Sequence, residues 1–407
     1  MSSTAGNLST SPPSSTVTQS STHLDAHRRE SRLRLGVGAS MLLGVFLLLF
    51  GAAWDAQWHA EVGRDRFFTP PHVTMYLGAT AVGLLCLVMV IVETIRYHRH
   101  DPAVNDETTI KVLGLFHAPL GFVVTGFGML MILLSAPLDN YWHLLYGIDV
   151  TVWSPFHIMG LLSGSIAFLG VIFLLSSEAT RARQYNPQQA RNSGTMRRWR
   201  LPSLPDVFQV AGLASTLAII LVVTLDNARL FQIGGLTFAI YPLVASLCAF
   251  FLVASTRITG RIGSATLMAL IFTLFRLLLA ITLKPAVAML VAQQQLYYRA
   301  DVPDFVIFTQ AYPAWLIAGG LLVDATYLLL PRLLKGRAWI MTATAMTAGL
   351  LAAASVALLE TSAWREQLDS ATFTGAWLTS LPVAALIGAG WGWLGDRFAI
   401  SARLLDR

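Results

Sequence analysis

The sequence predicts an all-α fold, a polytopic membrane bundle of about ten transmembrane helices. The 407 residues are 55% hydrophobic and only 12% charged, which is far more apolar than an ordinary soluble domain. Apolar runs of about 20 residues, the length needed to cross a bilayer, recur along the chain. They begin near Leu35, His72, Val112, Pro155, Asp206, Phe231, Arg261, Phe305, Ala338 and Trp377.

The distribution of Lys and Arg predicts the orientation of these spans. Short loops rich in these residues stay on the cytoplasmic side of a membrane. Basic segments fall on alternate turns of the chain, at 96–99, 181–200, 257–261, 332–337 and 397–407. Residues 1–34 are rich in Ser and Thr, then turn basic without a secretion signal, which predicts a disordered cytoplasmic tail. We therefore expect both termini in the cytoplasm of a bacterial-type inner membrane.

The chain divides into two predicted membrane units. Residues 35–180 contain four spans, residues 181–204 form a basic cytoplasmic linker, and residues 205–407 contain six spans of unassigned role. The cytoplasmic loops account for the net charge of +6, so the expected partner is the lipid bilayer rather than nucleic acid. Arg276 and Asp324 lie within spans, where charges usually face the protein interior and pair, so we predict a structural ion pair between them in preference to a proton-relay or substrate role.

Residues 55–72 and 139–157 are two copies of one motif. The first reads DAQWHAEVGRDRFFTPPH and the second reads DNYWHLLYGIDVTVWSPFH. With a gap of one residue, the two copies share seven residues in the same order. The pairs are Asp55 and Asp139, Trp58 and Trp142, His59 and His143, Gly63 and Gly147, Asp65 and Asp149, Pro70 and Pro155, and His72 and His157. This internal repeat predicts two copies of one functional site.

The spacing of the acidic and histidine residues is suited to metal binding. Asp and His four residues apart at a helix end lie on one face, one turn apart. Thr69-Pro70 and Ser154-Pro155 each predict an N-cap followed by proline, which places another histidine in the first turn of the returning helix. Each hairpin is thus expected to bring together one carboxylate and two imidazoles, ligands that copper, iron and zinc accept. The first set is Asp55, His59 and His72, and the second set is Asp139, His143 and His157.

Histidine usage supports this interpretation. All 9 histidines lie at or before position 157, so a histidine site must be built from the first four spans. The opposing interpretation is that Asp and His occupy the headgroup region and that Trp58 and Trp142 are interfacial aromatics. Matching spacing in two copies favours the metal site. Asp65 and Asp149 are then expected to orient the ligating histidines, with Trp58 and Trp142 beside them.

The first copy resembles the metal motif of the C subunit of copper membrane monooxygenases, the family of particulate methane and ammonia monooxygenases. It contains the pattern D-x-x-W-H followed by R-D-x-x-F-T-P-x-H. In that family copper is bound by the Asp, the His four residues later and the His thirteen beyond, which correspond to Asp55, His59 and His72. A second family site has Asn, His and His, and its spacing matches the second set.

The resemblance covers about residues 35–180. It implies copper as the cofactor, while ligand chemistry alone leaves iron and zinc open. It also implies separate monooxygenase-type subunits or a homo-oligomer as partners, because no cupredoxin-like domain is found in the sequence. Asp139 departs from the family's Asn and makes the second set more anionic. The first copy keeps more of the family run, including Arg64, Phe68 and Thr69, so we expect the first set to be the principal one.

Three functions are compatible with these features. The first is a copper-dependent oxidoreductase that uses oxygen to hydroxylate a small apolar substrate. The second is a non-enzymatic copper-handling or transport protein, although few polar residues mark a path through the bilayer. The third is a zinc hydrolase with Glu61 or Asp65 as the general base. We rank these hypotheses in this order.

Overall fold

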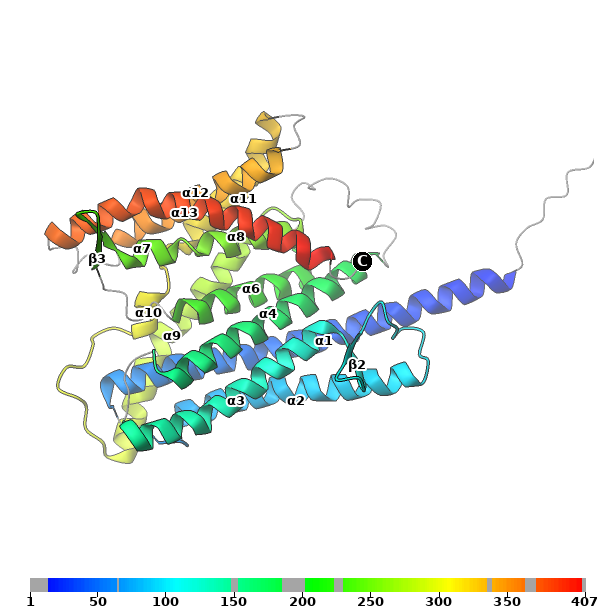
Figure 1. Cartoon of the computed structure of the whole chain (residues 1–407), viewed down its shortest axis with the longest axis horizontal. Helices are drawn as coiled ribbons and strands as arrows, with labels where there is room; N and C mark the ends of the chain where they lie inside the picture. Colours follow the sequence, from blue (N-terminus) through cyan, green and yellow to red (C-terminus); the bar gives the residue numbers. More distant parts are fainter. Residues whose placement is uncertain are drawn as a thin grey trace, which may run out of the picture.

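The structure is a helical bundle in which most helices run along the long axis of the molecule (Figure 1). This computed structural model describes residues 14–63, 66–147, 153–184, 202–222, 230–334, 339–362 and 371–404. Within those residues, 10 helices are long and apolar enough to cross a membrane. The predicted fold class is therefore confirmed, and the chain is an all-α, multi-pass membrane protein.

The first unit consists of four neighbouring helices. They are α1 (Ser14–Glu61), α2 (Pro70–His98), α3 (Leu120–Tyr146) and α4 (Pro155–Gln184). Glycine brings α3 and α4 close together, since a Cβ at Gly128 would lie 2.7 Å from the backbone oxygen of Ser163. Small residues at a helix contact allow this approach and strengthen packing in a bilayer. The hairpin that carries the second motif is therefore tightly packed.

The second unit contributes six further spans. Its helices are α6 (Leu204–Leu221), α7 (Ile240–Ala245) with α8 (Cys248–Thr259), α9 (Ser264–Gln294), α10 (Ile307–Ala311) with α11 (Leu316–Leu333), α12 (Ile340–Leu359) and α13 (Ala371–Leu404). A short 3-10 turn, η2 (Glu360–Ser362), follows α12. At the α12–α13 contact, a Cβ at Gly349 would overlap the backbone oxygen of Gly388, so these two helices touch backbone to backbone.

One apolar core joins the two units. The ring of Phe46 on α1 lies 5.5 Å from that of Phe275 on α9, and Phe173 on α4 lies 6.1 Å from Phe398 on α13. The start of α1 and the end of α13 lie at the same end of the bundle (Figure 1). Residues 185–201 of the predicted linker lie outside the described residues.

Two short hairpins stand where the third and sixth spans are predicted to begin, so both predicted starts are wrong. The antiparallel pairs are β1 (Ile110–Val112) with β2 (Phe116–Ala118), and β3 (Leu230–Ile233) with β4 (Leu236–Ala239). The chain reverses at Gly114 and at Gly234-Gly235, all with positive φ, which glycine adopts without strain. The helices consequently begin later, at Leu120 and Ile240.

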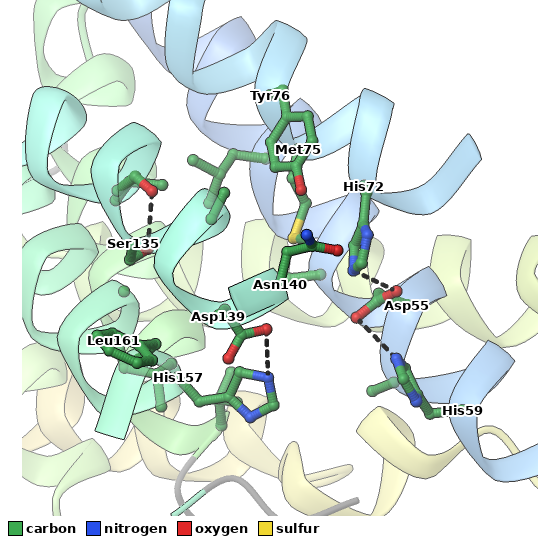
Figure 2. A pocket seen from close by; sticks show the side chains of 18 of the residues that line it. Asp55, His59, His72, Met75, Tyr76, Ser135, Asp139, Asn140, His157 and Leu161 are labelled. Carbon is green, nitrogen blue, oxygen red and sulfur yellow. Dashed lines mark hydrogen bonds and ion pairs between the residues drawn. The ribbon is translucent and has the colours of Figure 1, made fainter. Parts of the chain in front are cut away.

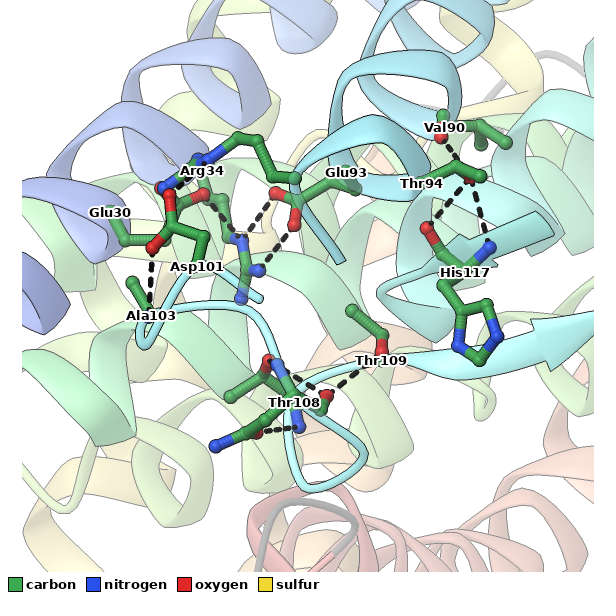
Figure 3. Close-up of polar contacts among 12 residues, drawn as sticks. Glu30, Arg34, Val90, Glu93, Thr94, Asp101, Ala103, Thr108, Thr109 and His117 are labelled. Carbon is green, nitrogen blue, oxygen red and sulfur yellow. Dashed lines mark hydrogen bonds and ion pairs between the residues drawn. The ribbon is translucent and has the colours of Figure 1, made fainter. Parts of the chain in front are cut away.

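The prediction that residues 1–34 are disordered is wrong for the basic residues at the end of this segment. α1 begins at Ser14, and Arg34 is only 1% exposed. Its guanidinium forms ion pairs with carboxylates from three helices, and Figure 3 shows two of these residues, Glu30 and Glu93. The three partners are Glu30 of α1 at 3.0 Å, Glu93 of α2 at 2.8 Å and Glu178 of α4 at 3.3 Å, which together with Arg34 we call the Arg34 cluster. Because a buried charge must be paired, this cluster makes the basic segment part of the folded helix.

The predicted ion pair between Arg276 and Asp324 is also wrong. Arg276 donates from Nη2 to the carbonyl of Thr309 and from Nε to that of Tyr312, both at 3.0 Å. Asp324 accepts from the Thr266 amide at 2.9 Å and from the Thr266 hydroxyl at 2.7 Å. Each charged group is thus satisfied by nearer hydrogen-bond partners on different elements, which removes the need for direct pairing.

Candidate metal centre

Both predicted ligand sets assemble at the end of the bundle opposite the Arg34 cluster. Asp55 and His59 lie in the last turns of α1, and His72 is the third residue of α2. Thr69 is the N-cap residue of α2, with proline following it, although its hydroxyl makes no capping hydrogen bond. Proline fixes the backbone angle needed for the first helical turn, so His72 enters the site on a rigid element.

In the first set, one carboxylate contacts two imidazoles through different oxygens (Figure 2). Asp55 Oδ1 lies 3.2 Å from His72 Nε2, and Asp55 Oδ2 lies 3.7 Å from His59 Nε2. The other ring nitrogen of His72, Nδ1, lies 3.1 Å from the carbonyl oxygen of Arg66. An Nδ1–H that donates to this carbonyl leaves Nε2 deprotonated, which is the form that binds a metal.

In the second set, one carboxylate oxygen serves both histidines. Asp139 Oδ2 lies 3.6 Å from His143 Nε2 and 3.4 Å from His157 Nε2. The two imidazole rings are 6.1 Å apart and nearly perpendicular, at 82°. The backbone N–H of His157 donates to Ser154 Oγ at 3.3 Å, as the N-cap prediction requires. Asp139 Oδ1 is buried without a hydrogen-bond partner among the described residues.

The two sets line the same cavity. Its volume is about 460 Å³. Figure 2 shows Asp55, His59 and His72 on one side of this space and Asp139 and His157 on the other. Apart from the ligand sets, the lining is mainly aliphatic and aromatic. The apolar lining includes Leu48, Ala52, Phe67, Ile132, Phe156, Leu161, Ile219, Ile307 and Phe308.

The geometry of each set fits a single metal ion. In each set, one ligand atom from every residue lies within 4.8 Å of the others. Two nitrogen or oxygen ligands about 2.0–2.2 Å from one ion lie roughly 3–3.5 Å apart. The carboxylate-to-imidazole distances of 3.2–3.7 Å are close to this range, so small side-chain movements would complete the coordination.

The predicted flanking residues differ in their placement. Trp58 is 1% exposed and packs in a cluster with Val62 and with α9 residues such as Val287. Trp142 lies against Tyr146, with the rings 4.3 Å apart. Neither tryptophan lines the cavity, although Trp142 also lies 6.0 Å from the ring of Phe156, a cavity residue, so their predicted role beside the ligands stays a prediction. Asp65 and Asp149 lie outside the described residues, so their predicted orienting role stays a prediction.

Sequence reasoning missed the part of the cavity that the second unit supplies. Helix α6 and its C-cap supply Ile219 and Val222. The segment between α9 and α11 supplies Arg299, Ile307 and Phe308. No motif links these residues to positions 55–157. One signal was present, since Arg299 lies in a loop on the side predicted to be poor in basic residues. A basic residue that violates the charge rule deserves a structural explanation.

Comparison of the chain with protein-family models, with curated proteins and with solved structures finds no match. The case for a function therefore depends on the two ligand sets and the cavity they share.

Proposed function

We propose that this chain is a copper-binding membrane protein that oxidises a small apolar molecule, in the manner of the copper membrane monooxygenases that its motif resembles. The observation that carries the proposal is that two Asp-His-His sets open into one largely apolar cavity. Imidazole ranks high among ligands for copper, and a carboxylate offsets part of the ion's charge. Bound copper would supply one-electron and oxygen chemistry.

The chain's own residues would hold the metal and shape the space beside it. The Arg66 carbonyl keeps His72 in the tautomer that presents Nε2 to the cavity. Apolar walls exclude water and favour an apolar molecule over a polar one. A cavity of about 460 Å³ lies within the range of small-molecule binding sites and has room for a small apolar molecule.

The first set is the better candidate for the principal site. His59 and His72 are 14% and 12% exposed; in the second set His143 is 10% exposed but His157 is 34% exposed, so the second set is the one with an open side. A more enclosed site excludes water better and strengthens electrostatic interactions within it. The second set would then be an accessory copper site in the same cavity.

Two alternatives receive less support. A zinc hydrolase needs a general base that faces the metal; of its two candidates, Glu61 is buried and accepts a hydrogen bond from Gln57 at 2.6 Å, and Asp65 lies outside the described residues. Non-enzymatic copper transport needs polar groups leading away from the sets, whereas the cavity is lined beyond them by Leu48, Ile132 and Leu161. Copper storage without catalysis remains the second candidate, because the same ligands would serve it.

The resemblance also suggests the setting of this activity. We place the chain in a bacterial-type inner membrane, with both termini cytoplasmic and both sets at the outer side. Separate monooxygenase-type subunits, or further copies of this chain, would complete the assembly and deliver electrons. Reporter fusions after residue 63 and after residue 147 should mark the outer side, and a cytoplasmic signal from either would contradict this topology.

Copper analysis of the purified protein tests the proposal directly. After dialysis, we expect one copper ion per set, with His59→Ala and His143→Ala each losing the ion of its own set. The double variant should bind none, since each set loses a ligand that the other cannot replace. Spectroscopy of the bound ion separates copper from iron and zinc.

His117→Ala is the matched control. His117 lies on β2, and its ring stacks on that of Tyr97 with the ring centres 3.6 Å apart. It lies near the Arg34 cluster and not near either ligand set (Figure 3), so its loss should leave copper occupancy unchanged. If the double variant retains full occupancy, the metal assignment is wrong.

A further inference from the structure

The segment between α9 and α11, residues 295–315, lies against the end of α1 that carries the first set. We call it the clamp segment. It contains α10 and contributes Arg299, Ile307 and Phe308 to the cavity. Because it belongs to the unit without histidines, its position beside a ligand set calls for a physical explanation.

One residue of the clamp segment, Arg299, holds the backbone of the last turn of α1 through two hydrogen bonds. The amide of Arg299 donates to the carbonyl of Glu61 at 2.8 Å. The guanidinium of the same residue donates from Nη1 to the carbonyl of His59 at 3.0 Å. The last carbonyls of a helix have no partner within the helix, and a cation there also interacts favourably with the helix dipole. Arg299 therefore caps the helix end at the ligand His59 itself.

A buried glutamine makes a second connection to the clamp segment. Gln57 lies on α1 between the ligands Asp55 and His59 and is fully buried. Its Nε2 donates to the carbonyl of Phe305 at 3.2 Å, and its Oε1 accepts from the amide of Ile307 at 2.8 Å. A side-chain amide that pairs with both a carbonyl and an N–H of one extended segment holds that backbone much as a neighbouring strand would. This contact fixes the rotation of α1 at the level of the first set.

The clamp segment is itself fastened to the second unit. Lys284 on α9 donates to the carbonyl of Pro303 at 2.7 Å, and Arg276 on α9 donates to the carbonyls at the end of α10. Tyr312 donates from its hydroxyl to the carbonyl of Ala218 on α6 at 3.0 Å. Trp58, the residue after Gln57, lies in an apolar cluster with α9 residues such as Val287 and with Leu296 of the clamp segment. The end of α1 is thus held by hydrogen bonds on one face and by apolar packing on another.

We propose that Gln57 and Arg299 are positioning residues, through which the six-helix unit holds Asp55 and His59 in the geometry that binds metal at the first set. This inference rests on the proposed function in one respect, the identity of the ion. It assigns a role to the second unit, and it explains why Arg276 and Lys284 occur within α9. Supporting groups around metal ligands commonly change metal affinity by about 10–100-fold when they are removed.

The test compares the two sets within one protein. In a His143→Ala background, which isolates the first set, Gln57→Leu should weaken copper binding by about tenfold. Arg299→Ala should weaken it in the same direction, and Arg299→Lys should recover part of the loss, because Lys can still donate to the His59 carbonyl. In a His59→Ala background, which isolates the second set, the same substitutions should leave the affinity unchanged.

Gln209→Leu and Arg99→Ala are the matched controls. Gln209 is an equally buried glutamine on α6 whose side-chain amide has no hydrogen-bond partner among the described residues, and Arg99 is exposed at the other end of α2. Neither substitution should change copper affinity at the first set.

A second measurement does not depend on metal. Amide hydrogen exchange in metal-free protein should become faster across residues 57–63 in Gln57→Leu and Arg299→Ala, and not in the controls, because the helix end loses its external partners. If exchange there is unchanged, or if copper binding falls equally at both sets, the positioning role is wrong. If the unaltered protein binds no copper, the proposed function fails, and the exchange experiment alone decides the role of the clamp segment.

Discussion

The two ends of the first unit carry similar numbers of charged and polar groups but organise them in opposite ways. At one end, the Arg34 guanidinium forms ion pairs at 2.8–3.3 Å with three carboxylates, of which Figure 3 shows Glu30 and Glu93. At the other end, the carboxylates and histidines surround a cavity (Figure 2). Charges that neutralise one another stabilise a fold, whereas ligands arranged around space are available to bind something. The arrangement, and not the number of charges, separates a structural site from a binding site.

We call the end with the Arg34 cluster the closed end and the end with the cavity the open end. The comparison predicts that substitutions at the closed end cost more stability than substitutions at the open end. Arg34→Met removes the cation that pairs with Glu93 and one of the two that pair with Glu178, which also contacts Arg181 at 2.7 Å; both carboxylates are 0% exposed. We expect a loss of about 3–5 kcal/mol in the free energy of unfolding. Thermal unfolding in detergent, followed by circular dichroism, measures this loss.

Two further variants check the physical reason for that loss. Arg34→Met combined with Glu93→Gln removes the uncompensated Glu93 charge, while Glu178 keeps its pair with Arg181, and should restore part of the stability. Arg28→Met, which breaks a more exposed pair with Asp25 at 3.5 Å, should cost no more than about 1 kcal/mol. A single Arg34→Met variant as stable as the unaltered protein would show that the cluster is not a structural element.

The open end offers a sharper comparison between its own two sets. Asp55 uses a separate oxygen for each histidine, whereas Asp139 presents the same oxygen, Oδ2, to both. An asparagine keeps one oxygen and turns the other position into an NH₂ donor. Asp55→Asn should therefore weaken copper binding at the first set by at least tenfold and abolish oxygen-dependent activity, while Asp139→Asn should be tolerated.

Copper titration against a competing chelator measures both variants, each in the background that isolates its set. Asp139→Asn also restores the residue found in the family that the motif resembles. The reverse pattern, with Asp139→Asn inactive and Asp55→Asn unaffected, would reverse the ranking of the two sets.

The smallest expected effect lies at the edge of the closed end. Asp101 accepts a hydrogen bond from Arg96 at 2.9 Å and one from the amide of Ala103 at 3.0 Å. Partial burial raises the pKa of Asp101. Together, the Ala103 amide and the Arg96 guanidinium lower this pKa by more than burial raises it, so the net pKa lies below its usual value. A lowered pKa in the folded state stabilises the fold above the ordinary Asp pKa of about 3.9, and this contribution disappears as the pH falls through the folded-state pKa.

Asp101→Asn should accordingly lose less than about 1 kcal/mol at neutral pH. The difference from the unaltered protein should vanish in acid, as measured by unfolding at a series of pH values. Glu107→Gln, in the same loop and exposed, is the control that should show little change at any pH. A difference that grows as the pH falls would mean that the ionised form of Asp101 does not stabilise this end.

Several features of this fold follow from local sequence alone. Spans such as α2 and α4 are visible as apolar runs of bilayer length, and the prolines at Pro70 and Pro155 mark where their helices begin. The hairpins before α3 and α7 were misassigned because short β-strands of apolar residues resemble the start of a membrane span. Their glycines, Gly114 and Gly234-Gly235, were the signal that could have revealed them.

The ligand sets were equally predictable because their residues are close in sequence. Asp and His four residues apart on a helix must share a face, and a helical hairpin must bring its two ends together. Local geometry therefore determined which residues could form each Asp-His-His set. The partners of Arg276 and Asp324 were not predictable in this way, since backbone carbonyls and hydroxyls compete with charges for the same hydrogen bonds.

The sequence by itself thus determined the membrane class, most of the spans and the two sets of candidate ligands. Only the tertiary structure decided that both sets open into one cavity, that Arg34 is buried among carboxylates, and that Gln57 and Arg299 join the first set to the six-helix unit. The physical reason is the range of the interactions. Helix formation and ligand spacing depend on neighbours within a few turns, whereas the cavity and the clamp segment depend on packing between residues about 240 positions apart.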